Sequence, residues 1–170
     1  MTQDERNTPS SQARGRAQDA PEPLDRALLL QALASCGSFN LRRAARLSCQ
    51  RYDEQLADAG LRATQLALLI MLAVNGPQPM AELAHELAVD PSTLSRNLRP
   101  LERSGYLTIT RGDSRAKFAS LTRAGEDAIR RAVPRWKRAH DAFVAQVGAD
   151  AWSKLLVDLG ALVRALRRDS

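Results

Sequence analysis

The stretch VDPSTLSRNLRPLERSGYL, from Val89 to Leu107, combines a leucine stripe with side chains that can form hydrogen bonds. Leu94, Leu98 and Leu101 recur at the spacing of one buried helix face. The positions between them carry short hydroxyls, an asparagine and arginines, which are groups that contact phosphates and base edges. We therefore expect a DNA-binding helix with a polar outer face. Its expected contact residues are Ser92, Thr93, Ser95, Arg96, Asn97 and Arg99.

The residues after this helix predict a basic β-hairpin. YLTIT and AKFASLT alternate apolar and polar side chains, and RGDSR between them has the composition of a turn. A short helix, a second helix with a polar outer face and a basic hairpin form the layout of a winged helix-turn-helix. In that layout the second helix enters the major groove, and the hairpin reaches the minor groove or the phosphates. The expected contacts on the hairpin are Arg111, Asp113, Arg115 and Lys117.

Two other interpretations of these residues stay open. An arginine-bearing helix face is often only solvated, and helix-turn-helix modules can also bind proteins. The charge distribution favours nucleic acid as the partner, because Val89 to Arg123 holds seven basic residues and three acidic ones in a chain with a net charge of +6.

The turn and the interior of the expected DNA-binding helix each carry an unusual residue. Asp90 is a good N-cap and is followed by a proline that suits the first helical position. The preceding turn carries Ala88 where glycine is usual, so we expect its backbone to avoid the left-handed region. Pro100 removes an interior hydrogen bond, which predicts a kink or a DNA-reading part limited to Ser92 to Arg99.

Helical periodicity covers most of the remaining chain and predicts a mainly α-helical protein with a small β-hairpin. We expect a helix break near SCGSFN, a buried helix capped by Thr64, another helix capped by Thr122 and a separation at Gly148. The expected organisation is a disordered tail at 1–23, N-terminal helices at 24–60, a winged helix-turn-helix domain at 61–123 and C-terminal helices at 124–170.

Composition argues against several other classes of protein. No apolar run reaches the length of a membrane helix and the N-terminus lacks a hydrophobic signal region, so we expect a cytoplasmic protein with no membrane partner. Two cysteines and two histidines are too few for a disulfide framework or a zinc cluster, so no metal or cofactor is expected. The chain has no Gly-rich phosphate loop, nucleophile elbow or H-E-x-x-H motif, so we do not expect an enzyme.

Four segments together resemble the MarR family of winged helix-turn-helix transcriptional regulators. They are LRRAARL…YDEQLADAGLRATQLALL, AELAHELAVDPSTLSRNLRPLERSGYL, GDSRAKFASLTRAGEDAI and a late helix that contains a proline and a tryptophan. The resemblance extends from about Leu24 to Arg168. Its most specific part is the wing pair Asp113 and Arg115, followed by Leu121-Thr122 and Gly125.

The resemblance implies a homodimer that binds a pseudo-palindromic operator, most commonly as a repressor. The implied dimerisation layer comprises Leu24 to Ser35 and Ala139 to Leu166. These terminal helices carry more apolar positions than one helical hairpin needs, which favours burial against a partner, although a monomeric bundle is the alternative. The resemblance also implies that Arg115 enters the minor groove, that Asp113 orients the wing arginine, and that Arg96 and Asn97 lie at recognition-helix positions.

Regulators of this family commonly release DNA when a small phenolic or aromatic acid, or an oxidant, reaches them. The implied ligand-binding residues are Phe39, Arg43, Arg46 and Trp136, which offer rings for stacking and guanidinium groups for a carboxylate. The same residues could equally be core or surface residues. An oxidant-sensing repressor is an alternative, but the reactive cysteine position of that branch aligns with Ser38 and not with Cys36. An architectural DNA-binding protein without ligand response is a third possibility.

Overall fold

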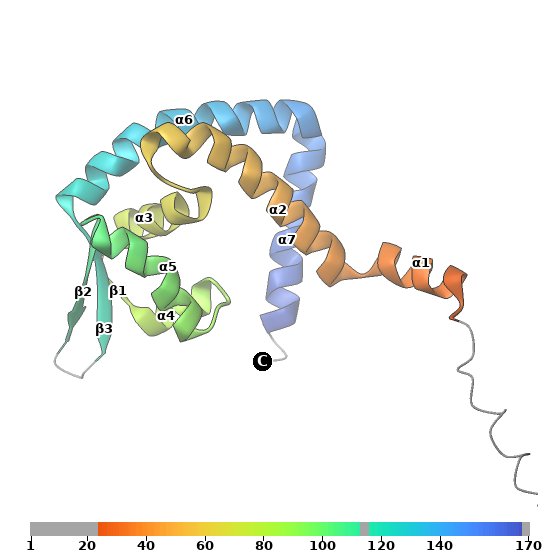
Figure 1. Cartoon of the computed structure of the whole chain (residues 1–170), viewed down its shortest axis with the longest axis horizontal. Coiled ribbons are helices and arrows are strands. Elements are labelled where there is room, and N and C mark those ends of the chain that lie inside the picture. Colours follow the sequence, from red (N-terminus) through yellow and green to blue (C-terminus); the bar gives the residue numbers. More distant parts are fainter. Residues whose placement is uncertain (1–23, 113–115, 168–170) are drawn as a thin grey trace, which may run out of the picture. The chain divides into compact units, whose positions relative to one another are not determined.

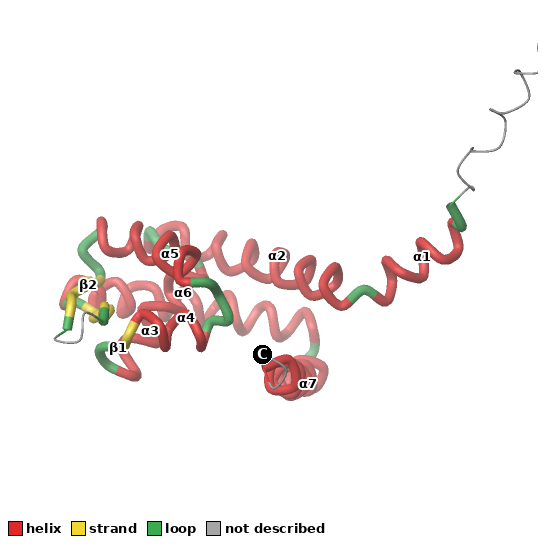
Figure 2. The backbone as a smooth tube through the Cα atoms, turned by 90° about the horizontal axis from the view of Figure 1, so that it is seen from below, coloured by secondary structure: helices red, strands yellow, loops and turns green. Residues whose placement is uncertain are grey.

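The structure is a computed structural model that describes residues 24–112 and 116–167, and the chain divides into two compact units, Met1–Arg42 and Arg43–Ser170. Figure 1 shows the order of the elements, and Figure 2 shows that helices dominate while the short strands lie together. The prediction of a mainly α-helical winged helix-turn-helix fold is confirmed. Residues 1–23, which the sequence predicts to be disordered, lie outside the described residues.

The N-terminal helices break where the sequence predicts. Helix α1, Arg26–Ser35, begins after Asp25, whose carboxylate accepts the amide of Ala27 at 2.9 Å. It ends at Cys36, where the backbone is extended (φ −68°, ψ 107°), and helix α2, Gly37–Leu56, starts directly afterwards. The extended residue at Cys36 accounts for the predicted break near SCGSFN.

The start of helix α3, Ala63–Asn75, differs from the prediction. Thr64 does not cap this helix, since the helix begins one residue earlier. The amide of Ala63 instead donates to Oδ1 of Asp53 on α2 at 2.6 Å, and the amide of Arg62 donates to Oε1 of Gln65 at 2.9 Å. A carboxylate ten residues away therefore satisfies this half-buried amide, which local capping patterns do not indicate.

Leucines from several elements form the core of the second unit. Alanines on helix α6, Arg123–Val147, are fully buried at Ala128 and Ala132, which lets its backbone lie close to α3. In the parts of the chain that the structure describes, no single helix is both long and apolar enough to cross a membrane. Gly37–Ala59 and Ala63–Asn75 meet that test of length and composition only together, with a bend of 74° between them. The largest fully buried side chains are Leu56, Leu66, Leu69, Leu72, Leu83, Leu94, Leu98, Leu101 and Leu107.

The wing is a three-stranded antiparallel sheet in the order β1-β3-β2. The predicted hairpin is confirmed as β2, Leu107–Arg111, and β3, Lys117–Leu121, with Leu107 opposite Leu121 and Arg111 opposite Lys117. The third strand, β1, consists only of Gln78–Pro79 and pairs with β3. The sequence did not indicate β1, because two residues that include a proline carry no strand pattern.

A close backbone approach joins the wing to helix α6. The Thr122 hydroxyl donates to the carbonyl of Gly105 at 2.6 Å and accepts the amide of Gly125 at 3.1 Å, so the predicted cap is confirmed. A Cβ atom added at Gly125 would lie 2.1 Å from the carbonyl oxygen of Tyr106. That carbonyl also accepts the amide of Thr122 at 3.1 Å, so only glycine fits at this crossing.

Helix α4, Met80–Glu86, ends in a conformation that the sequence did not predict. Ala88 has φ +51°, so the expectation that it avoids the left-handed region is wrong. Its amide donates to the carbonyl of His85 at 3.1 Å, and the amide of Val89 donates to the carbonyl of Ala84 at 3.0 Å. This pair of bonds is a Schellman motif, which requires a left-handed residue at Ala88 whatever its side chain.

Two prolines lie inside helices. Helix α5, Pro91–Arg103, continues through Pro100 for almost another turn, and α6 likewise contains Pro134. Helix α5 therefore continues past Arg99, and the limit of its DNA-reading part at that residue stays a prediction. Gly148, with φ +94°, separates α6 from helix α7, Ala149–Arg167, as predicted.

The strain at Ala88 leads to a stability prediction. Ala88→Gly should raise the free energy of unfolding by about 1 kcal/mol, because glycine lacks the Cβ that crowds a left-handed backbone. Urea denaturation measures this change. Gly105, with φ +70°, holds the corresponding position after α5, so Gly105→Ala should lower the free energy of unfolding by about the same amount. A lower unfolding midpoint for Ala88→Gly would contradict the left-handed backbone.

Candidate nucleic-acid interface

Helix α5 turns its leucines to the core and its hydrogen-bonding groups to solvent. Leu94 and Leu98 are 0% exposed and Leu101 is 1% exposed. Five of the six predicted DNA-contacting residues on this helix are exposed, and Thr93 is half-buried. The structure thus leaves the predicted polar face accessible on one rigid element. The exposed residues are Ser92, Ser95, Arg96, Asn97 and Arg99.

The first turn of α5 is organised around one carboxylate. Asp90 accepts the amide of Thr93 at 2.9 Å, which is the expected N-cap, and it also accepts the hydroxyls of Ser92 at 2.5 Å and Thr93 at 2.7 Å. The guanidinium of Arg96 in turn donates to the Thr93 hydroxyl at 2.9 Å. The hydrogen bonds from Ser92 and Thr93 hold the pKa of the Asp90 carboxyl well below its ordinary value.

The start of helix α3 lies next to the polar face of α5. A cavity of about 330 Å³ is lined on the α5 side by Arg96, Asn97 and Pro100, and on the other side by Arg62 and residues of α3. Arg62 is exposed, so it adds a guanidinium beside two predicted contact residues. Arg62 is not among the contact residues predicted from the sequence, because only the packing of α3 against α5 brings it beside them.

The described part of the wing carries paired positive charges. Arg111 and Lys117 lie directly opposite each other in the β2–β3 register, and both are exposed. Like charges at opposed positions destabilise a sheet. Phosphate groups close to both side chains would reduce this repulsion. Asp113 and Arg115, which the resemblance places at the wing tip, lie outside the described residues.

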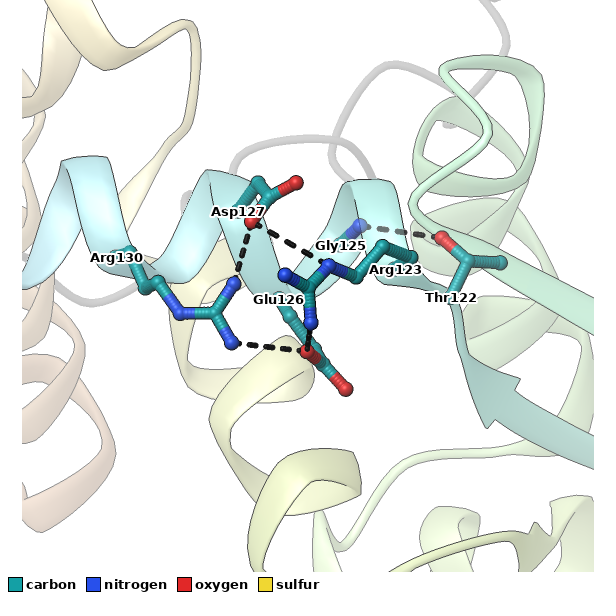
Figure 3. A network of polar contacts seen from close by, with 6 residues as sticks. All are labelled: Thr122, Arg123, Gly125, Glu126, Asp127 and Arg130. Atoms are coloured by element: carbon teal, nitrogen blue, oxygen red, sulfur yellow. Dashed lines mark hydrogen bonds and ion pairs between the residues drawn. The ribbon is translucent and has the colours of Figure 1, made fainter.

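The arginines at the start of α6 have a different environment (Figure 3). Arg123 pairs with Glu126 at 3.2 Å, and Arg130 pairs with Glu126 at 3.0 Å and also with Asp127. Hydrogen bonds to both acids raise the pKa of Arg130 above its ordinary value. Acidic partners offset these two positive charges locally, so Arg123 contributes less to a cationic surface than the sequence count suggests.

An aromatic cluster joins α2, α6 and α7 within the second unit. The Tyr52 hydroxyl and Nδ1 of His140 lie 2.9 Å apart, and burial raises the pKa of Tyr52. The Trp136 ring stacks on His140 with 4.9 Å between centroids and 8° between planes. Phe143 and Trp152 complete the cluster with an edge-to-face contact at 5.1 Å. The spacing of these rings along the sequence does not indicate that three helices meet there.

The structure places the predicted ligand-binding residues in two units. Phe39 belongs to the first unit and is 42% exposed. Arg43 and Arg46 are exposed on the part of α2 in the second unit, and Trp136 belongs to the aromatic cluster with 36% of its surface exposed. A cavity of about 240 Å³ lies elsewhere between α2 and α6, with Arg51, Glu54, Gln55, Arg138, Ala139, Ala142, Phe143 and Gln146 as its lining.

The two cysteines are free thiols in different surroundings. Cys36 is exposed at the end of α1, and Cys49 is half-buried on α2. The exposed thiol is accessible to solvent, but accessibility alone does not make a cysteine reactive.

Comparisons with known proteins agree with this geometry. The MarR family model matches residues 61–115. An HTH-type transcriptional regulator of Bacillus cereus is 31% identical over 112 residues, which cover 66% of this chain and 76% of the relative. The M. tuberculosis transcriptional regulator MosR in complex with DNA is 34% identical with a TM-score of 0.71, over 79% of this chain and 98% of that chain.

A more distant structure shares the fold. CouR from Rhodococcus jostii RHA1, bound to p-coumaroyl-CoA, is 21% identical with a TM-score of 0.65, over 78% of this chain and 94% of that chain. The exposed polar face of α5, the adjoining wing and the similarity over most of the Bacillus relative lead to one conclusion. This chain belongs to the MarR family of DNA-binding transcriptional regulators.

Proposed function

We propose that this protein is a homodimeric repressor that binds a pseudo-palindromic operator in the cytoplasm and releases it when a small aromatic or phenolic acid binds. Helix α5 would enter the major groove through the face that starts at Ser92, while Arg111 and Lys117 would follow the backbone. In a dimer the two α5 helices would meet half-sites about 34–36 Å apart, one helical turn of DNA.

The observation that carries this proposal is the contrast between two sets of basic side chains. Within residues 24–112 and 116–167, no ion pair joins Arg99, Arg111 or Lys117 to a carboxylate, whereas Arg123 and Arg130 on α6 are paired with acids. The positive charge therefore remains available on α5 and the wing, where DNA phosphates would neutralise it.

The exposed apolar faces of α1 and α7 support the homodimer. Neither helix has a buried residue, although both are rich in leucine. On α1 the leucines are 50% to 61% exposed, and on α7 Leu155, Leu162 and Leu166 are exposed along one side of the helix. Apolar surface of this extent is stable in water when a partner covers it, and a second copy of the chain supplies a matching surface. The exposed leucines of α1 are Leu28, Leu29, Leu30 and Leu33.

The aromatic cluster supports the proposed response to an aromatic acid. Trp136 leaves part of its ring exposed above His140, and the exposed Arg43 and Arg46 are available to pair with a carboxylate. An acid bound by these groups would change the packing of α2, α6 and α7 together, because the cluster joins those three helices. A change in their packing is a physical route from ligand to DNA release.

The first test of the DNA-binding surface uses the opposed charges of the wing. Lys117→Glu should stabilise the free protein by about 0.2–1 kcal/mol, because it replaces a like-charge pair with an opposite-charge pair. The same change should weaken operator binding about tenfold and lower the slope of log affinity against log salt by about 1, through loss of a phosphate contact. Urea denaturation and fluorescence anisotropy measure the two effects.

Lys137→Glu is the matched control, since Lys137 pairs with Asp141 on α6 at 2.8 Å and lies outside the predicted DNA contacts and the proposed dimerisation layer. It should leave operator affinity almost unchanged. Equal operator affinities for the two variants and the wild type would contradict a role of the wing in DNA binding.

The second test addresses the dimer. Light scattering should give a mass of about twice 18.6 kDa for the wild type, and Leu162→Lys should produce monomers that bind a full operator far more weakly. Val74→Lys is the control, because Val74 is 76% exposed but lies on α3, outside the proposed dimerisation layer. A wild-type mass of one chain at micromolar concentration would rule out the dimer.

The third test addresses the effector. A panel of benzoates, hydroxybenzoates and cinnamates should contain acids that raise the melting temperature and also release operator DNA. Trp136→Ala should abolish both effects, while Trp152→Phe, which keeps an aromatic ring in the cluster, should retain them. If no acid both stabilises the protein and releases DNA, the proposed ligand response is wrong.

A further inference from the structure

Three hydroxyl groups in the first turns of α5 each lie within hydrogen-bonding distance of an acceptor on the protein. Ser92 and Thr93 contact separate oxygens of the Asp90 carboxylate at 2.5 and 2.7 Å, and Ser95 contacts the carbonyl of Pro91 at 2.8 Å. A hydroxyl has one proton to donate and two lone pairs to accept with. The direction of each bond therefore decides what the hydroxyl can still offer to DNA.

The direction of these bonds follows from the charge of Asp90. An aspartate carboxyl is ionised at neutral pH and then has no proton to give, and the amide of Thr93 at 2.9 Å further favours the ionised form. Ser92 and Thr93 must both donate to it. The backbone carbonyl of Pro91 also has no proton, so Ser95 donates as well.

We propose that Asp90 determines which hydroxyls of the recognition helix donate and which accept hydrogen bonds; this inference rests on the proposed placement of α5 in the major groove. As a consequence, Ser92 accepts a hydrogen bond from a base amino group, and Thr93 orients the guanidinium of Arg96. Asp90 is a positioning residue here and need not touch DNA. Its effect is to turn the hydroxyl protons inward, which leaves lone pairs facing outward.

The outward lone pairs restrict which bases fit at Ser92. In the major groove, the hydrogen-bond donors on base edges are the amino groups of adenine and cytosine, whereas guanine N7 and O6 and thymine O4 are acceptors. A serine that has already donated its proton can accept from an amino group but cannot donate to an acceptor or to a phosphate oxygen. Ser92 should therefore favour adenine or cytosine at its position.

The same arrangement gives different residues of the helix different hydrogen-bonding roles. One lone pair of the Thr93 hydroxyl accepts from Nη2 of Arg96 at 2.9 Å, which ties the guanidinium to the first turn and limits its directions. The serines thus present acceptors, while Arg96 and Arg99 present donors that suit guanine or phosphate. This pattern predicts a half-site in which an amino-bearing base lies near a guanine.

Asp90→Asn tests the proposal, because asparagine caps a helix as well as aspartate but carries an amino group in place of one oxygen. Its amide nitrogen must donate, so one of the two hydroxyls has to accept and turn its proton outward. Binding-site selection followed by sequencing should show a changed base preference at one position of each half-site. Affinity for the wild-type site should fall about five- to tenfold, the loss of one or two hydrogen bonds.

The salt dependence and the melting temperature separate positioning from a purely structural role. The slope of log affinity against log salt should stay unchanged, since no phosphate contact is removed. The melting temperature should change by no more than about 2–3 °C, because the cap is kept. A lower melting temperature with an unchanged base preference would show that Asp90 only caps the helix, and would overturn the proposal.

Two serine variants keep the test decisive even if Asp90→Asn folds poorly. Ser92→Ala removes the proposed acceptor and should erase the preference for adenine or cytosine at that position without creating a new one. Ser104→Ala is the matched control at the other end of the same helix, where the exposed Ser104 lies outside the predicted DNA contacts, and it should leave the preference for adenine or cytosine intact. If Ser92→Ala selects the wild-type sequence, the proposal is wrong. If the wild type selects no sequence at all, the proposed function itself fails.

Discussion

Burial of the leucine face of α5 is the constraint on which the DNA-binding surface depends. Leu94, Leu98 and Leu101 are almost completely removed from solvent, and burying each leucine side chain contributes about 1.5–3 kcal/mol. A rotation of α5 about its axis would expose these side chains, so their burial sets which residues face outward. The orientation of Arg96 and its neighbours is therefore a consequence of core packing and not of any interaction that they make themselves.

The wing depends on the same core through a short, crowded junction. Thr122 joins the end of α5 to the start of α6, since its hydroxyl reaches the carbonyl of Gly105 and accepts the amide of Gly125. The carbonyl of Tyr106 lies where a side chain at Gly125 would be, so the strands and α6 approach closely. The position of the wing beside α5 is thus determined by backbone contacts, which leaves the side chains of Arg111 and Lys117 available to a partner.

Among the described residues, some surface side chains already have partners within the chain, whereas others have none that cover them. The arginines at the start of α6 have carboxylate partners, and the first turn of α5 has a carboxylate that collects hydroxyl protons. The leucines of α1 and α7 remain exposed in a single chain. A DNA duplex would complement the cationic face, and in the proposed homodimer a second copy would cover the apolar faces.

Local patterns in the sequence determined the helices, the hairpin, and the caps at Asp90 and Thr122, because periodicity and capping depend on residues only a few positions apart. Tertiary structure decided the rest. Asp53 rather than Thr64 satisfies the start of α3, and β1 exists only because β3 offers it a partner. Ala88 is left-handed because the Schellman bonds and the packing of α4 and α5 outweigh its own preference. The direction of the Ser92 and Thr93 protons likewise follows from the geometry around Asp90, which the order of residues alone does not contain.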